Sequence, residues 1–127
     1  WNHSECVLMM NDLTALINSV LADYDEGRTP NHAAAQEAVL ACLDELVRLA
    51  PGRSVEVRIP PFGAVQAVAG GAHRRGTPRA VVETDAATWL RLATGRLTWA
   101  DAVNTGALHA SGERSDLSPY LPLVVSQ

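Results

Sequence analysis

Histidine, cysteine and serine side chains are the groups of this chain that could bind a metal or act as nucleophiles. The four histidines show neither an HxxxH pair nor an acidic ligand at helical spacing, so the sequence predicts no metal site. Cys6 and Cys42 match no metal or redox spacing, and we expect unpaired thiols in a reducing cytoplasm. Neither a G-x-S-x-G elbow nor a phosphate-binding glycine loop occurs. The absence of lysine also excludes Schiff-base chemistry through a lysine amine.

The carboxylates give no better case for catalysis. Asp101 and Asp116 are explained as helix-start residues rather than as an acid/base pair. We therefore predict that the chain is not an enzyme on its own, has no catalytic residue and needs no cofactor. A net charge of −4 gives no reason to expect a nucleic acid partner, because phosphate backbones bind basic faces. No apolar run reaches the roughly 18 residues of a membrane span, so a cytoplasmic protein is expected.

Three arginines around one turn are the candidate site for an anion. Arg74, Arg75 and Arg79 belong to a polar, glycine-containing loop that is predicted to be a hairpin connection. Guanidinium groups grip phosphates and carboxylates through paired hydrogen bonds, so the loop could hold an anionic head group. A solvated turn without a ligand is the alternative explanation.

Two predicted helices precede the part of the chain that carries most of these residues. Apolar side chains at spacings of three and four predict amphipathic helices from Asp12 to about Asp23 and from about Asn31 to Ala50. Thr29 followed by Pro30 is expected to start the second helix, because proline at the first helical position sacrifices no needed N–H.

The periodicity then changes to the alternation that is typical of strands. Asp85 or Thr84 and, further on, Thr98 are expected to cap two short helices, and Gly95 fits the end of the first. The predicted strands span 54–59, 62–69, 80–83 and 106–111, the two short helices span 86–93 and 99–104, and a turn with a short helix follows over 112–122.

The helix–glycine–helix segment 84–102 resembles that of the bacterial, actinobacterial-type sterol carrier protein family. Residues 104–112 look like the strand that follows it in that family, and residues 55–66 resemble its first hairpin. The likeness covers about 53–123.

The resemblance implies an α+β, SCP-2-like fold. It implies a mainly antiparallel sheet of about five strands with helices packed on one face, here preceded by the two N-terminal helices. We expect a disordered or vector-derived leader over 1–11 and a single domain over 12–127, with its helical pair at 12–50. Residues 117–122 are shorter and richer in proline than the C-terminal helix of typical carriers.

Members of the family bind sterols, fatty acids or acyl-CoA, or serve as accessory domains of enzymes. The resemblance therefore implies a hydrophobic cavity between helices and sheet, and plain core packing is the alternative for the same side chains. Indole N–H groups need partners when buried, so both tryptophans of the set are expected at the margin of the core. The candidate lining residues are Phe62, Trp89, Leu92, Trp99, Val103 and Leu108.

Three functions are consistent with the sequence. The leading hypothesis is non-catalytic binding of a lipid or other hydrophobic small molecule. The second is a structural or interaction protein with a filled core, acting as a homodimer through the N-terminal helices, whose apolar stripes must be buried somewhere. The third is an accessory subunit of another protein, such as an enzyme of thiol-dependent chemistry.

Overall fold

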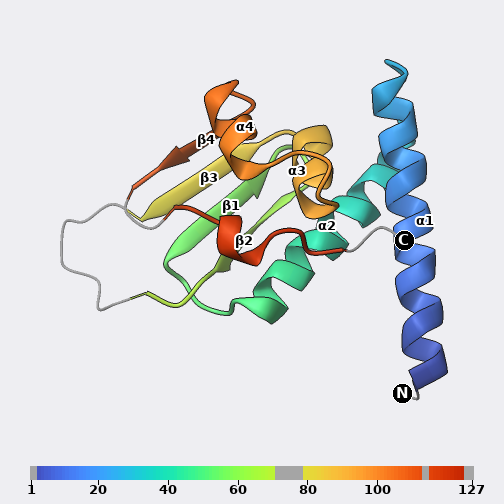
Figure 1. The fold of residues 1–127 in the computed structure, drawn as a ribbon, viewed down its shortest axis with the longest axis horizontal. Helices are drawn as coiled ribbons and strands as arrows, with labels where there is room; N and C mark the ends of the chain where they lie inside the picture. The colour runs from blue at the N-terminus through green and yellow to red at the C-terminus, as the bar shows by residue number, and fades with distance from the viewer. Residues whose placement is uncertain (1–2, 71–78, 113–114, 125–127) are drawn as a thin grey trace.

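Two long helices, a sheet with two short helices and a final turn follow one another along the chain (Figure 1). The computed structural model describes residues 3–70, 79–112 and 115–124, and for residues 3–10 it describes only the helical backbone. The predicted α+β class is confirmed.

The first helix, α1 (His3–Asp25), begins earlier than predicted. Apolar spacing places its start near Asp12, whereas the backbone is helical from His3 onward, so the helix includes most of the expected leader. Each residue added to an existing helix contributes one hydrogen bond, so a helix can continue beyond its apolar stripe where no proline or glycine stops it.

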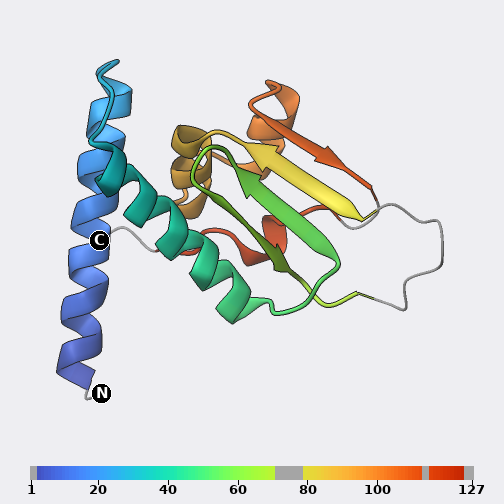
Figure 2. The ribbon, with the colours of Figure 1, turned by 180° about the vertical axis from the view of Figure 1, so that it is seen from behind.

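The apolar stripe of α1 is buried within this chain. Ile17, Val20 and Leu21 are at most 2% exposed, and α1 contacts both α2 (His32–Leu49) and α3 (Ala86–Ala93). Figures 1 and 2 show α1 standing at one end of the molecule, with its N-terminal part extending past the other elements. The chain itself thus supplies the cover that the stripe requires.

Two polar contacts also hold α1 against the end of α3. A guanidinium nitrogen of Arg91 lies 3.0 Å from an Asp25 carboxylate oxygen. Arg96, just beyond α3, donates to the side-chain oxygen of Asn18 at 2.8 Å. Both contacts are exposed, so their role is to orient the helix more than to stabilise the fold.

Asn31 caps α2, in place of the predicted start at Thr29 and Pro30. The Asn31 side chain accepts a hydrogen bond from the Ala34 N–H at 3.1 Å, which satisfies one of the free donors at the helix start. Pro30 is buried just before the cap. The sequence offers two adjacent helix-start signals here, and the asparagine side chain is the one used.

The described residues form a four-stranded sheet, not the expected sheet of about five strands. The strand order is β2-β1-β3-β4, with antiparallel outer pairings and a parallel pairing between β1 and β3. The parallel pair requires a crossover, which depends on distant contacts that strand alternation does not reveal. The strands are β1 (Val55–Ile59), β2 (Gly63–Ala67), β3 (Ala80–Thr84) and β4 (Leu108–Ser111).

The two faces of the sheet have opposite character. Val55, Val57 and Ile59 of β1 point to one face and are fully buried. Glu56 and Arg58, which alternate with them, point to the other face and form a paired side-chain contact at 3.0 and 3.2 Å. This hydrogen bonding by Arg58 holds the pKa of the Glu56 carboxyl below its ordinary value. One face is therefore apolar and covered, and the other is polar and open to solvent.

The two short helices begin and end where the sequence predicts. The side chain of Asp85 accepts from the Thr88 N–H at 2.7 Å and starts α3, and Thr98 caps α4 (Trp99–Asn104) by accepting from the Asp101 N–H at 3.1 Å. Gly95 follows α3 with a φ of 77°, a left-handed conformation that favours glycine.

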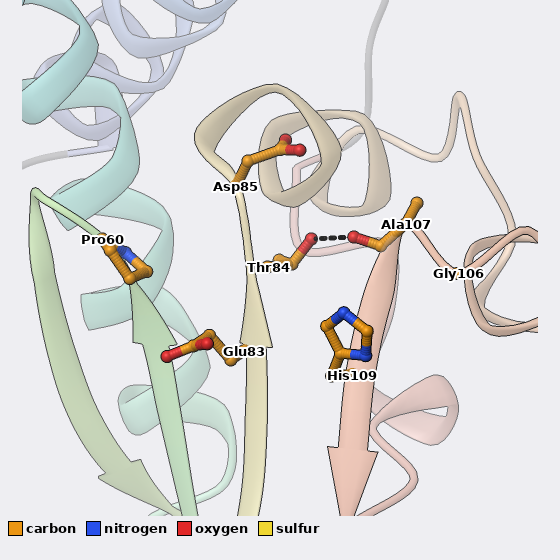
Figure 3. A pocket seen from close by; sticks show the side chains of 7 residues that line it. All are labelled: Pro60, Glu83, Thr84, Asp85, Gly106, Ala107 and His109. Carbon is orange, nitrogen blue, oxygen red and sulfur yellow. Dashed lines mark hydrogen bonds between the residues drawn. The ribbon is translucent and has the colours of Figure 1, made fainter.

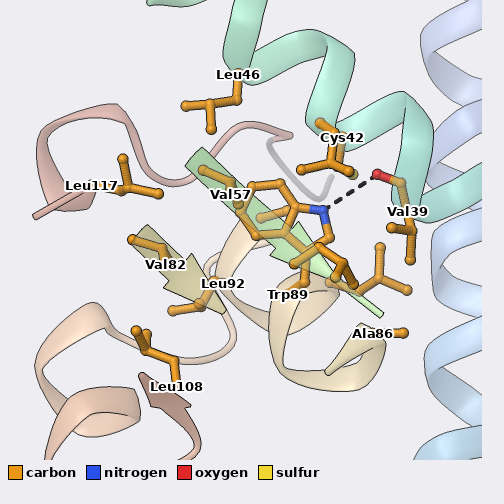
Figure 4. Close-up of a cluster of buried hydrophobic side chains, with 14 of the residues drawn as sticks. Val39, Cys42, Leu46, Val57, Val82, Ala86, Trp89, Leu92, Leu108 and Leu117 are labelled. Atoms are coloured by element: carbon orange, nitrogen blue, oxygen red, sulfur yellow. Dashed lines mark hydrogen bonds between the residues drawn. The ribbon is translucent and has the colours of Figure 1, made fainter. Parts of the chain in front are cut away.

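The C-terminal segment covers the same sheet face as the helices. Leu117 is fully buried beside Val82, as Figure 4 shows, and it precedes the short 3-10 helix η1 (Ser118–Tyr120). The backbone N–H groups of Leu123 and Val124 each donate to the Ala93 carbonyl at 2.9 Å. This contact joins the end of the described chain to the end of α3.

Candidate ligand-binding site

Trp89 lies at the centre of the apolar layer between the helices and the sheet (Figure 4). Its side chain is 1% exposed, and its indole N–H donates to the Val39 carbonyl of α2 at 3.3 Å. The expectation that both tryptophans sit at the core margin is therefore wrong for Trp89. A backbone carbonyl of the neighbouring helix satisfies its N–H inside the core, and that contact joins residues too distant in sequence to be foreseen.

Three of the six candidate lining residues meet in this layer. Trp89, Leu92 and Leu108 are 1%, 1% and 3% exposed, and Figure 4 shows them in one cluster with Val57 and Val82 of the sheet. The three come from α3 and from the start of β4.

Two other candidates lie on α4 at the margin of this layer. Trp99 is partly buried and packs against the core, whereas Val103 is 44% exposed. Helix α4 contacts β4, whose first residue, Leu108, is buried. Apolar side chains of increasing exposure thus lead from the core to the surface along α4.

Phe62 lies in the turn between β1 and β2 and packs against the edge of the same core. Its ring is partly buried and lies 5.0 Å from the ring of His32, centroid to centroid, at the start of α2. The structure therefore buries Trp89, Leu92 and Leu108 together, and Trp99 and Phe62 pack against the same core as partly buried residues.

Of the three candidate head-group arginines, the structure describes one. Arg79 is exposed and directly precedes β3, and its charge contributes to lowering the pKa of Glu56. Arg74 and Arg75 lie outside the described residues.

A polar pocket that the sequence does not predict opens beside the carboxyl end of β3 (Figure 3). Its volume is about 400 Å³. Glu83 and His109 are register partners on β3 and β4 and both line this pocket, but the Glu83 carboxylate extends toward β1, away from the His109 ring. The alternation within β3 and β4 indicates that Glu83 and His109 each point to the polar face of the sheet. The pairing of β3 with β4 then brings them to the same pocket. The lining residues are Pro60, Glu83, Thr84, Asp85, Gly106, Ala107 and His109.

Two of the four polar side chains that line this pocket have structural partners. The Thr84 hydroxyl donates to the Ala107 carbonyl at 2.8 Å, and Asp85 caps α3. One carboxylate and one imidazole, from Glu83 and His109, are left facing solvent. Across the described part of the chain, no three His, Cys, Asp or Glu side chains are grouped to hold a metal ion.

Cys42 is fully buried in the same apolar layer as Trp89. Burial, together with the nearby Glu45 carboxylate, raises the pKa of its thiol to about 12. A thiol with so high a pKa is protonated near neutral pH and is a poor nucleophile. Cys42 therefore acts as a small apolar core residue.

Comparison with known proteins identifies the family. A model of the bacterial SCP ortholog family matches residues 31–123. The chain belongs to this family. The resemblance that the helix–glycine–helix segment predicts is thus confirmed, and α1 lies outside the matched segment. A comparison with curated proteins finds no match.

The family segment contains the sheet and the helices α2, α3 and α4, whereas α1 adds Ile17, Val20 and Leu21 to the same core from outside it. It runs from the Asn31 cap of α2 to Leu123, whose N–H bonds to Ala93. Within the described residues, none of the helices is both long and apolar enough to cross a bilayer.

Proposed function

We propose that this chain binds a lipid or another hydrophobic small molecule and catalyses no reaction of its own. Membership of the bacterial SCP ortholog family over residues 31–123 carries the proposal, because SCP-type domains are generally carriers. The proposal implies that the protein acts in the cytoplasm.

The proposed site lies beneath α4, between Trp99 and the inner residues Leu92 and Leu108. Burial of apolar ligand surface there stabilises the complex by roughly 25 cal/mol for each Å² removed from water. Val103, at 44% exposure, would be the first side chain that a ligand meets. Trp89 would form the inner wall, and Phe62 would lie outside the part of the site that the ligand first enters.

An anionic end group, if the ligand has one, would be held by arginine. Arg79 is exposed at the start of β3, and Arg74 and Arg75 precede it in the chain. Guanidinium groups suit carboxylates and phosphates because they offer two parallel N–H donors.

The alternative is a structural or interaction protein with a filled core. Near-complete burial of Trp89, Leu92 and Leu108 favours this alternative, because side chains packed against one another leave less room for a ligand. A homodimer through the N-terminal helices, or a role as accessory subunit, belongs to the same alternative.

Ligand titration of two matched variants tests the proposal. Val103→Asp places a charge on the proposed ligand path, and we expect it to weaken binding of a fluorescent fatty acid to delipidated protein about tenfold or more. Leu49→Asp is the control, because Leu49 is 47% exposed on α2, far from α4 in the fold. Both variants should keep the thermal midpoint of the unchanged protein, since both positions are exposed.

Two results would reject the carrier function. One is a delipidated protein that binds neither fatty acids nor sterols at micromolar concentration. The other is native mass spectrometry that finds no lipid mass on protein taken from its source. Equal loss of binding in both variants would instead move the site away from α4.

A further inference from the structure

The strand β4 forms an open edge of the sheet. It pairs with β3 alone, and Figures 1 and 2 show no described element beyond its outer side, with α4 only at its beginning. An edge strand presents unpaired backbone N–H and C=O groups, which form hydrogen bonds with water or with another strand.

Apart from its short length of four residues, this edge lacks the features that usually prevent strand addition. The sequence of β4, Leu-His-Ala-Ser, contains no proline, carboxylate, lysine or arginine, and its register with β3 is regular, without a bulge. His109, Ala110 and Ser111 are all exposed, so the described side chains of the same chain do not shield the strand. Proline, inward charge or a bulge would be the ordinary protection.

Apolar surface adjoins the open edge. Leu108 is buried on the helix-covered side of the strand, but Ala110, on the same side, is exposed. Helix α4 contacts β4 and contributes Val103, one of two exposed large hydrophobic residues among the described positions, and the partly buried Trp99. Addition of another strand would form hydrogen bonds with the free backbone groups and would bury the neighbouring apolar side chains.

We propose that β4 is the interface of a two-fold symmetric homodimer, in which the β4 strands of two copies pair antiparallel and join the two sheets. The occupant is a second copy because the edge is complementary to itself. With Ala110 at the symmetry axis, His109 lies opposite Ser111 of the partner subunit, so an imidazole meets a hydroxyl and no like charges face each other. The proposal does not depend on lipid binding, and it uses a different surface from the N-terminal helices.

Sedimentation velocity of three proteins tests this interface. The unchanged chain should sediment with twice its mass of 13.5 kDa, and Ala110→Glu should sediment as a monomer, because two carboxylates would face each other at the axis. Ala64→Glu is the matched control, since Ala64 is an exposed alanine of β2, the strand at the opposite end of the sheet, and its dimer should persist. Circular dichroism checks that both variants remain folded.

Cross-linking gives a second readout that does not require a destabilised dimer. Residues directly opposite each other in an antiparallel pair have Cβ atoms about 4.5–5.5 Å apart, a separation that small shifts bring into disulfide range. Ala110→Cys, in a Cys6→Ser background, should form disulfide dimers rapidly on mild oxidation, whereas Ala64→Cys should not. An unchanged chain that sediments as a monomer at every concentration overturns the proposal, including a monomer that instead binds an extended peptide. A dimer that persists in Ala110→Glu also overturns the proposed β4 interface, because the dimer would then form through another surface, such as α1.

Discussion

Cys42 illustrates how burial changes the chemistry of a single residue. The thiol is fully buried between α2 and the sheet, and its pKa is raised from the ordinary 9.0 to about 12, first by desolvation and then by Glu45. In the sequence, Cys42 matches no metal or redox spacing. The large shift of its pKa could not be foreseen, because it depends on how many apolar groups the fold packs around it.

The raised pKa of Cys42 predicts how stability depends on pH. Between about pH 9 and 12 the unfolded chain loses the thiol proton and the folded chain keeps it, so the free energy of unfolding falls as pH rises. The slope from this one group is at most about 1.4 kcal/mol per pH unit. This slope is measured by urea unfolding of the unchanged protein and of Cys42→Ala between about pH 8 and about pH 10.5, a range that crosses the ordinary thiol pKa of 9.0.

The Cys42→Ala variant should show a shallower pH slope. Tyr24, whose pKa is also raised by burial, is present in both proteins, so its contribution cancels in the comparison. Equal slopes would show that Cys42 is ionised at the same pH in both states. Slow labelling of the folded protein by a thiol reagent, followed by fast labelling in urea, would confirm burial independently.

At the level of elements, local signals decide how much is predictable. Helices α3 and α4 have the predicted bounds because Asp85, Thr98 and Gly95 are caps that act within four residues of sequence. The start of α2 is less certain from sequence, since Thr29, Pro30 and Asn31 are competing signals. The strand order and the parallel pairing of β1 with β3 are non-local, and alternation alone does not predict them.

The cap of α3 gives a prediction at this level. Asp85→Ala removes the acceptor for the Thr88 N–H, and we expect a loss of about 1 kcal/mol in the free energy of unfolding. Asp44→Ala is the control, because Asp44 is exposed in the middle of α2 and should change stability by less than about 0.5 kcal/mol. Chemical denaturation of both variants measures the difference, and equal stabilities would mean that the cap contributes nothing.

For the whole molecule, α1 is the element that the family does not explain. It lies outside residues 31–123, yet its apolar stripe is buried against two helices of the family segment. The sequence predicts the stripe and the need to bury it. It does not predict that this chain supplies the cover, because the docking of α1 onto α3 joins segments more than sixty residues apart, as the bond from Arg91 to Asp25 shows.

Substitution of a buried residue of α1 tests whether the helix is part of the cooperative fold. Leu21→Ala removes a fully buried side chain, and we expect the free energy of unfolding to fall by about 2–5 kcal/mol. Leu16→Ala, at a half-buried position on the same helix, should have a smaller effect. If Leu21→Ala changes only the exchange rates of α1 amides and not the global unfolding midpoint, α1 docks as a separate unit.

The candidate lining residues remain a prediction. Helical spacing on α3 explains why Trp89 and Leu92 lie close together, and Leu108 joins them through the sheet. The polar pocket at Glu83 and His109 depends on the pairing of β3 with β4, so the alternation within either strand is not sufficient to predict it.

The two tryptophans of the α3–α4 region give the molecule a built-in optical reporter. Trp89 is sealed in the apolar layer and should emit at short wavelength, whereas Trp99 is partly open to water and should emit further to the red. With Trp1 replaced by Phe, a change of emission from Trp99 alone would signal an event beneath α4. Simultaneous change of both would signal that the helices have separated from the sheet. Ligand binding and loss of packing can therefore be distinguished in a single sample by the wavelength of tryptophan emission, without attaching any dye to the protein.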